Sequence, residues 1–498
     1  TVDLPTGRAY VQPVNLRGRL PLPLTAALAA ALAAASPALA AEPPGKEWTP
    51  LNDQPSSEVN INNTNEVGLE RTADGVLHVV WVNGRDNGTE ALIHTPFTGT
   101  DPESPGALGA ETTILVLDPS SNESFNDRVD LIRDSGGNIR ALFGALNPGS
   151  PYDTILATTS SATGASWSAV VPASATAPGQ RSPVYAAAGI GGGTGLDGTI
   201  FSTWGDSSPS GGGYHVGLNT ANPDVPFTAA CCEIDPNVGV DSTTGEVAVA
   251  SNIQGSGIRV KLLNGGATLT VPKSGAAYPA QRTSISGRIG APGIWVGYGT
   301  GTNQFDAKPA VWEVGAQKFT FLKNQGDAEH VGLASAPGGR LWVYWERDEV
   351  VFATRTNPEV TKFGAIVKAK GPLGGANATY RLAGEGSLGS LDLFGLFDVQ
   401  GNLGWWTERF APGLSLKGEA SVKAGKKLGL TVTDAGEPVK GVEVYTFLGK
   451  KKIDDTSNAK GKVELKIPKS AKPGKEKAYT DAGAAYTDGK AEYKIKKK

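Results

Sequence analysis

The segment Gly339-Arg-Leu-Trp-Val-Tyr-Trp345 carries a pattern that recurs along the chain. A glycine precedes a short run of aromatic and β-branched residues, which is typical of a strand that follows a tight turn. Six further copies follow glycines 75, 137, 198, 245, 293 and 389, with runs at 76–81, 138–143, 199–204, 246–250, 294–298 and 390–394. Successive glycines are 46 to 62 residues apart. A repeat of about 50 residues built from short strands is typical of β-propeller blades.

Each run is flanked by two further strand-like segments. One precedes the turn glycine, near residues 66, 128, 183, 237, 283, 330 and 380, and the other follows the run, near residues 91, 154, 215, 258, 310, 350 and 403. Three or four strands per unit give a propeller over residues 60–410. We expect seven blades, or six if the first or last unit is an insertion. No helical periodicity competes with this pattern beyond the N-terminal segment.

The composition changes after Pro412. Alternating segments at 428–432, 442–445, 463–467 and 493–495 predict a small Ig-like β-sandwich over residues 415–498, so the whole fold is all-β. Residues 411–498 hold 20 Lys and 11 Asp or Glu, against a net charge of -3 for the whole chain. This basic region either faces an anionic surface or is a solvated lysine-rich face. The overall charge indicates no nucleic-acid partner.

The first 41 residues read as a secretion leader. Arg17 and Arg19 precede an Ala/Leu-rich run, and Ala38-Leu-Ala40 supplies a small-residue cleavage site. We expect a signal peptide at 1–41 and a linker at 42–59. A transmembrane anchor is the alternative, but Pro21, Pro23 and Pro37 shorten the apolar run. The leader predicts a secreted or cell-surface protein with no membrane span after cleavage.

One turn resembles the Asp-box of the sialidase-like (BNR-repeat) β-propellers. In Thr159-Ser-Ser-Ala-Thr-Gly-Ala-Ser-Trp167, the residues Ser160, Gly164 and Trp167 match the pattern Ser-x-Asp-x-Gly-x-x-Trp, while Ala162 replaces the aspartate. The other units show no clear copy. The resemblance implies a propeller in which this turn is structural and remote from any catalytic site. The Phe/Tyr-Arg-Ile-Pro motif of sialidases is absent.

Four arginines stand at or just before the first strand of a unit: Arg128, Arg181, Arg282 and Arg381. A propeller brings equivalent positions of different units together around its channel, so these side chains are candidates for one anion-binding site. A guanidinium suits this task because its planar fork donates two parallel hydrogen bonds to a carboxylate or phosphate. The alternative is that each arginine pairs with loop carbonyls or acids on the rim.

Catalytic candidates are fewer. Tyr380 adjoins Arg381, and Glu329 with His330 occupies the matching place in the sixth unit. The resemblance implies that a tyrosine beside a carboxylate is a sialidase-type nucleophile pair. Tyr380 and Glu329 are therefore candidate catalytic residues, and His330 is a candidate ligand-binding residue.

Cys231 and Cys232 are adjacent and are the two cysteines of the chain. In an oxidising compartment they can pair within one molecule only with each other, which predicts a strained vicinal disulfide. Two reduced thiols are the alternative.

Cofactor and metal signals are weak. No histidines have zinc-ligand spacing, so we predict neither a metal nor a cofactor. The leading hypothesis is a secreted or cell-surface propeller that binds an anionic or carbohydrate ligand, such as an anionic glycan or a cell-wall polymer, at the channel mouth. The alternatives are a sialidase-type exo-glycoside hydrolase and a structural surface protein. The ligand's identity and the oligomeric state stay open.

Overall fold

The structure is a computed structural model that describes residues 48–51, 66–84, 89–98, 107–117, 124–146, 153–173, 187–208, 213–219, 225–229, 233–253, 257–263, 268–276, 283–301, 307–323, 325–372, 379–399 and 402–497. These residues form strands, and the helical elements among them are two short 3₁₀ turns, Ser274–Ala276 and Gly483–Ala485. None of the helices in this part of the chain is long and apolar enough to cross a membrane. The all-β class predicted from the sequence is confirmed.

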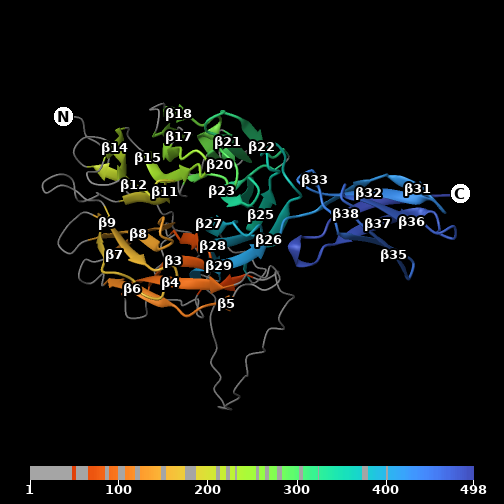
Figure 1. The fold of residues 1–498 in the computed structure, drawn as a ribbon, viewed down its shortest axis with the longest axis horizontal. Helices are drawn as coiled ribbons and strands as arrows, with labels where there is room; N and C mark the ends of the chain where they lie inside the picture. The colour runs from red at the N-terminus through yellow and green to blue at the C-terminus, as the bar shows by residue number, and fades with distance from the viewer. Residues whose placement is uncertain are drawn as a thin grey trace, which may run out of the picture. The chain divides into compact units, whose positions relative to one another are not determined.

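The described residues between 49 and 410 form seven small antiparallel sheets (Figure 1). The first three contain β2 (Gly68–Arg71), β3 (Leu77–Gly84), β4 (Glu90–Thr98), β5 (Ala107–Leu108) and β6 (Thr112–Leu117); β7 (Ser124–Arg133), β8 (Ile139–Leu146), β9 (Asp153–Ser160) and β10 (Val171–Pro172); and β11 (Ala187–Thr194), β12 (Ile200–Ser208), β13 (Gly213–Asn219) and β14 (Val225–Ala229). The fourth and fifth contain β15 (Glu233–Val240), β16 (Val247–Ile253), β17 (Gly257–Leu262) and β18 (Thr268–Thr270); and β19 (Ser284–Ser286), β20 (Trp295–Thr300), β21 (Lys308–Glu313) and β22 (Phe319–Phe321). The sixth contains β23 (Glu329–Ala336), β24 (Arg340–Arg347), β25 (Val350–Arg355) and β26 (Val367–Lys370), and the seventh contains β27 (Thr379–Glu385), β28 (Leu391–Val399), β29 (Asn402–Phe410) and β1 (Thr49–Pro50).

The repeating glycines are the hairpin turns between the first and second strand of each sheet. All seven have a positive φ, from 74° at Gly339 to 110° at Gly293. A side chain would be strained in this conformation, so the turn selects glycine. The second strand of each sheet begins within one residue of the predicted run. The sequence pattern is therefore a repeated β-hairpin.

The first strands of the seven sheets form a closed ring. They contact one another in the order β2, β7, β11, β15, β19, β23 and β27, and β27 contacts β2 again. The outer strand of the seventh sheet comes from the other end of this region, because β1 pairs with β29 through Thr49 and Thr407. This strand lies inside the segment predicted as a linker. Trp48, just before β1, packs its ring against Phe397 at 4.7 Å and closes the seventh sheet.

The core lies between neighbouring sheets, where large side chains of one sheet pack against the next. Trp342 and Tyr344 of β24 share one buried cluster with Leu393 and Phe397 of β28. The first strand of a sheet carries small residues where the neighbour approaches, as at Gly239, whose missing side chain makes room for Ile285 and Ile294. Burial of this apolar surface is the main force that holds the sheets together.

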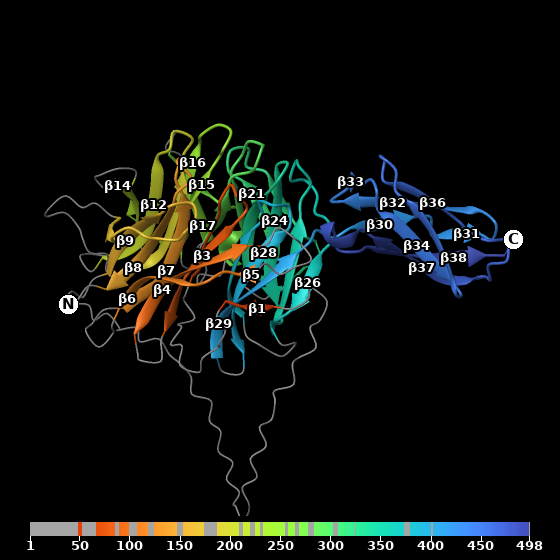
Figure 2. The ribbon, with the colours of Figure 1, turned by 60° about the horizontal axis from the view of Figure 1, so that its bottom comes forward.

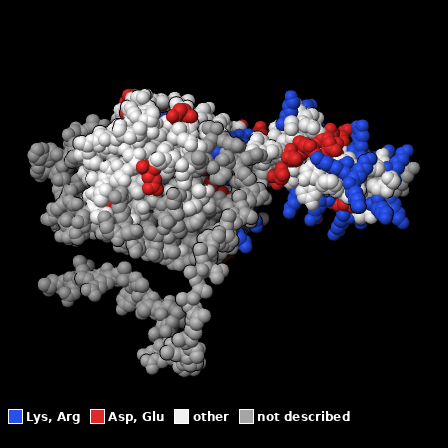
Figure 3. All heavy atoms as spheres, turned by 90° about the horizontal axis from the view of Figure 1, so that it is seen from below, with Lys and Arg blue, Asp and Glu red and all other residues white. Residues whose placement is uncertain are grey.

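Two further sheets form from described residues after 414 (Figure 2). One contains β30 (Ser415–Gly418), β32 (Lys427–Asp434), β33 (Glu437–Pro438) and β36 (Lys462–Lys466), and the other contains β31 (Ser421–Lys423), β38 (Lys490–Lys496), β37 (Gly474–Asp481), β34 (Glu443–Leu448) and β35 (Lys451–Thr456). Inward residues such as Leu428, Leu430 and Ile495 form a shared core. On the face that Figure 3 shows, lysines are spread over the surface of these sheets, with acids among them. The Ig-like topology and the domain boundaries stay predictions.

Candidate functional site

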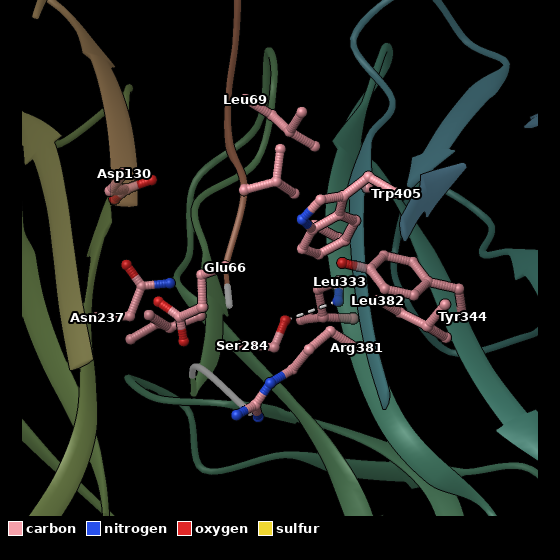
Figure 4. Close-up of a pocket in the computed structure, with 14 residues that line it drawn as sticks. Glu66, Leu69, Asp130, Asn237, Ser284, Leu333, Tyr344, Arg381, Leu382 and Trp405 are labelled. Carbon is pink, nitrogen blue, oxygen red and sulfur yellow. Dashed lines mark hydrogen bonds between the residues drawn. The ribbon is translucent and has the colours of Figure 1, made fainter. Parts of the chain in front are cut away.

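A small pocket lies where the first strands of the ring converge, and it has a volume of about 150 Å³. Six of the seven described sheets of the ring contribute to its wall. Figure 4 shows Asp130, Glu66 and Asn237 on one side and Tyr344 and Trp405 on the other, with Arg381 below. The pocket therefore combines carboxylates, an amide, a guanidinium and aromatic rings contributed by distant parts of the chain.

The polar residues of the wall hold neighbouring sheets at a fixed distance. The Asp130 carboxylate accepts a hydrogen bond from the backbone N–H of Gly192 in the next sheet at 2.8 Å. The Asn237 amide donates to the carbonyl of Thr283 at 3.1 Å. The N–H of Leu333 donates to Ser284 Oγ at 2.7 Å, which is the dashed line of Figure 4. These bonds satisfy backbone groups that the ring buries and fix the orientation of the side chains.

The aromatic wall depends on two glycines. Tyr344 of β24 lies between Gly332 of β23 and Gly384 of β27, and a Cβ on either glycine would overlap its ring, at 2.2 Å for Gly332 and 2.7 Å for Gly384. Trp405 of β29 completes the wall, and only 2% of its surface is exposed. Figure 4 shows both side chains across the pocket from the carboxylates, with the Tyr344 hydroxyl and the Trp405 indole nitrogen on the pocket side.

The charges of the wall are mixed in sign. Glu66, Asp130 and Arg381 are all buried, and Arg381 is only 2% exposed. Arg381 lies at a β-bulge of β27, where the register shifts between Thr379 and Arg381. Bulges redirect side chains and are common near functional sites. Four other first strands, β7, β11, β15 and β23, carry a register shift as well.

The predicted site residues have different outcomes. Arg381 lies in the pocket wall. Arg128 lies in β7 and Tyr380 in β27, and the structure describes only their backbone. Arg181 and Arg282 lie outside the described residues, as do Cys231 and Cys232, so the arginine cluster and the vicinal disulfide stay predictions. Sequence reasoning missed Glu66, Asp130 and Asn237, although Glu66 and Asn237 start the first-strand segments of their units and could have been found by aligning the repeats.

Glu329 and His330 lie together on the sixth sheet, with a partner that sequence reasoning missed. Donor atoms of Glu329, His330 and Glu346 all lie within 4.8 Å of one another. Glu329 of β23 is directly opposite Glu346 of β24. Burial raises the pKa of Glu346 to about 7, and the carboxylate of Glu329 contributes. Burial, with Asp348 and Asp327 nearby, also raises the pKa of Glu329. Either carboxyl therefore holds a proton more readily than an exposed glutamate.

The Asp-box-like turn packs on a buried pair of histidines. The ring nitrogens His78 Nδ1 and His94 Nε2 are 2.9 Å apart, and the Trp167 ring contacts His94 at 5.4 Å. Gly164 has a φ of 68°, as a glycine of this turn requires. His78 lies inside β3 and is fully buried. The pair stabilises the contact between the first two sheets and lies outside the pocket wall.

Comparisons with solved structures find sialidases and a lectin among the similar proteins. The chain is similar to the Hadza microbial sialidase Hz136, with 12% identity, a TM-score of 0.42, and coverage of 61% of this chain and 65% of that one. It is similar to Trypanosoma rangeli sialidase in complex with the inhibitor DANA, with 9% identity, a TM-score of 0.45, and coverage of 89% and 88%. It is also similar to the SapL1 lectin in complex with alpha methyl fucoside, with 12% identity, a TM-score of 0.36, and coverage of 64% and 98%.

At identities of 9 to 12% the likeness to these proteins concerns the fold alone. No protein-family model matches the chain, and no curated protein matches it in sequence.

Proposed function

We propose that the seven described sheets are the blades of one seven-bladed propeller, which is secreted or displayed on the cell surface and binds one sugar unit of a glycan in the central pocket. The observation that carries this proposal is the composition of the wall, where Glu66, Asp130 and Arg381 face two aromatic residues. Sugar hydroxyls both donate and accept hydrogen bonds, and the apolar face of a sugar ring packs on aromatic rings. A wall of this kind matches both properties.

The size and charge of the pocket limit the class of ligand that can bind there. A volume of about 150 Å³ is below the roughly 300–1,000 Å³ of pockets for drug-sized ligands, so we expect a single terminal sugar unit. Two carboxylates and one arginine in the wall favour a sugar with several hydroxyls and at most one negative charge. Arg381 would hold such a carboxylate, and Glu66 and Asp130 would accept from hydroxyls.

The test is calorimetric titration of the mature chain with neutral hexoses, sialic acid and uronic acids. Arg381→Ala and Glu66→Gln should each weaken binding of the preferred sugar at least tenfold, which is about 1.4 kcal/mol. Arg133→Ala is the matched control, because Arg133 lies on the same ring and its side chain is 44% exposed in a pair with Glu70. Equal affinity in all three variants, or no binding of any sugar, would overturn the proposal.

The same preparations distinguish a binding protein from an enzyme. Hydrolysis of an aryl glycoside by the wild type, lost in Tyr380→Phe or Glu329→Gln, would support the sialidase-type alternative. Sugar binding without hydrolysis would support the binding function. If the chain neither binds sugars nor hydrolyses the glycoside, the results would support the alternative of a structural surface protein.

A further inference from the structure

One corner of the sixth sheet gathers a buried and a partly buried glutamate around an imidazole. Glu329 and Glu346 are direct cross-strand partners, and His330 follows Glu329 in β23. Donor atoms of the three residues lie within 4.8 Å of one another. Glu346 is 5% exposed and His330 is 4% exposed. Three groups that can each supply a metal ligand thus share one small, largely buried volume.

When both carboxyls are ionised, this arrangement costs stability, and either a proton on one of them or a bound cation would relieve that cost. Like charges directly opposite each other on neighbouring strands repel, and a buried carboxylate loses its hydration. The arginine next in sequence does not pair with these glutamates. Arg347 places its Nε 3.9 Å from Asp348 and its guanidinium 4.8 Å from the centre of the Phe352 ring. A bound cation would offset the repulsion between the two carboxylates.

The backbone around the cluster is held in a costly conformation. Asp327, His330, Asp348 and Glu349 all have a positive φ, between 49° and 62°. The N–H of Glu349 donates to Glu346 Oε1 at 2.5 Å and fixes that carboxylate. A register shift between Glu329 and Gly332 turns His330 out of the regular ladder. Strained residues of this kind concentrate at sites whose side chains must be aimed.

We propose that Glu329, His330 and Glu346 bind one divalent transition-metal ion, with Zn²⁺ as the best fit. Imidazole nitrogen and carboxylate oxygen are both zinc ligands, and three protein ligands leave a fourth position for water. Mg²⁺ and Ca²⁺ prefer sites made entirely of oxygen. The site is separate from the central pocket, although Tyr344, two residues before Glu346 on β24, lines that pocket.

The experiment is titration of the metal-free full chain with Zn²⁺ alone, followed by calorimetry and thermal unfolding. We expect the wild type to bind Zn²⁺ with micromolar or tighter affinity and to unfold at a higher temperature when loaded. Glu346→Gln should weaken this binding at least tenfold and remove the thermal shift. Asp348→Asn is the matched control, because it removes a neighbouring charge on a side chain that is 89% exposed, and it should stay within twofold of the wild type.

Two further measurements test whether the zinc binds at this cluster and do not depend on Glu346→Gln alone. His330→Gln should lose the same binding event, which separates this site from zinc bound at cysteines or at His78 and His94. Wild-type chain loaded with Co²⁺ should show the visible absorption of a nitrogen- and oxygen-ligated ion, which does not depend on whether a variant folds. The proposal is overturned if the wild type shows no Zn²⁺ binding tighter than millimolar, if Glu346→Gln and Asp348→Asn bind equally well, or if excess Mg²⁺ displaces the zinc.

Discussion

Arg71 and Asp392 lie 321 residues apart in the chain and form a buried ion pair where the seventh sheet meets the first. Arg71 also donates to Glu385 at 2.6 Å, and Arg409 donates to Asp392 at 2.5 Å. The ring is therefore closed by charges in its interior as well as by the pairing of β1 with β29.

Asp392→Ala should lower the free energy of unfolding by about 3–5 kcal/mol, because it leaves two buried guanidinium groups without their shared carboxylate. Urea denaturation measures the change. The control is Glu464→Ala, which breaks the pair with Lys427 at a site where both side chains are 58% exposed, and its cost should be far smaller than that of Asp392→Ala because water screens an exposed pair. Similar losses of unfolding free energy in the two variants would contradict the role of Asp392 in joining the seventh sheet to the first.

Trp48→Ala should destabilise the ring by about 3–5 kcal/mol, the usual cost of removing a buried indole. Its ring packs on Phe397 and its Nε1 donates to the carbonyl of Lys370 at 2.6 Å. Thermal unfolding provides the measurement. Val171→Ala, on the outer strand of the second sheet and at a side chain that is 51% exposed, should change stability by no more than about 0.5 kcal/mol. A stable Trp48→Ala protein would show that β1 is dispensable.

Gly164→Ala should lower the free energy of unfolding by more than the strain of an alanine with positive φ, because the new side chain also overlaps a neighbour of the Asp-box-like turn. The new Cβ would lie 2.2 Å from His94 Cε1, besides adopting a φ of 68°. Gly137→Ala is the matched comparison, since its φ is 82° and nothing lies within 4 Å of the added atom. We expect about 1–2 kcal/mol for Gly137→Ala and a clearly larger loss for Gly164→Ala in denaturant titrations. Equal losses would show that the turn does not press on His94.

Stability should fall in mild acid because of His94. Burial, with a smaller effect of His78, lowers the pKa of His94 to about 3, whereas an imidazole in the unfolded chain titrates near about 6.5. Between these values the unfolded state binds more protons, so stability is complete above about pH 6.5 and decreases toward pH 3, by at most about 1.4 kcal/mol per pH unit.

Denaturation at several pH values measures this slope, and His94→Gln should reduce it by about one proton. Burial lowers the pKa of His78 too, although Asp74 opposes that shift, so part of the slope remains in the variant. An unchanged slope in His94→Gln would assign the acid sensitivity to other groups.

N-terminal sequencing of exported protein should begin near Ala41 or Glu42, if the leader is cleaved where its small residues predict. This cleavage leaves Trp48 and β1 in the mature chain, so the ring can still close. A start beyond residue 51 would remove β1 and should give a protein that is less stable by the cost of the seventh sheet's outer strand.

The hairpins were predictable because each depends on a few neighbouring residues. A turn glycine followed by an alternating apolar run specifies a turn and a strand independently of distant residues. Gly339 and the run at 340–345 could therefore be assigned from the sequence. The outer strands, such as β10 and β26, are short and lack a pattern of their own, and β1 depends on a partner, β29, that lies far along the chain.

The all-β class, the repeat and the positions of the seven described hairpins follow from the sequence, because they are local properties of the backbone. Which side chains meet depends on the tertiary structure. Ring closure brings Glu66 and Asp130 to Arg381, and strand pairing places Glu346 opposite Glu329. Such contacts are set by register shifts of one or two residues and by the packing of each sheet on the next, and neither leaves a mark in the sequence around any single residue.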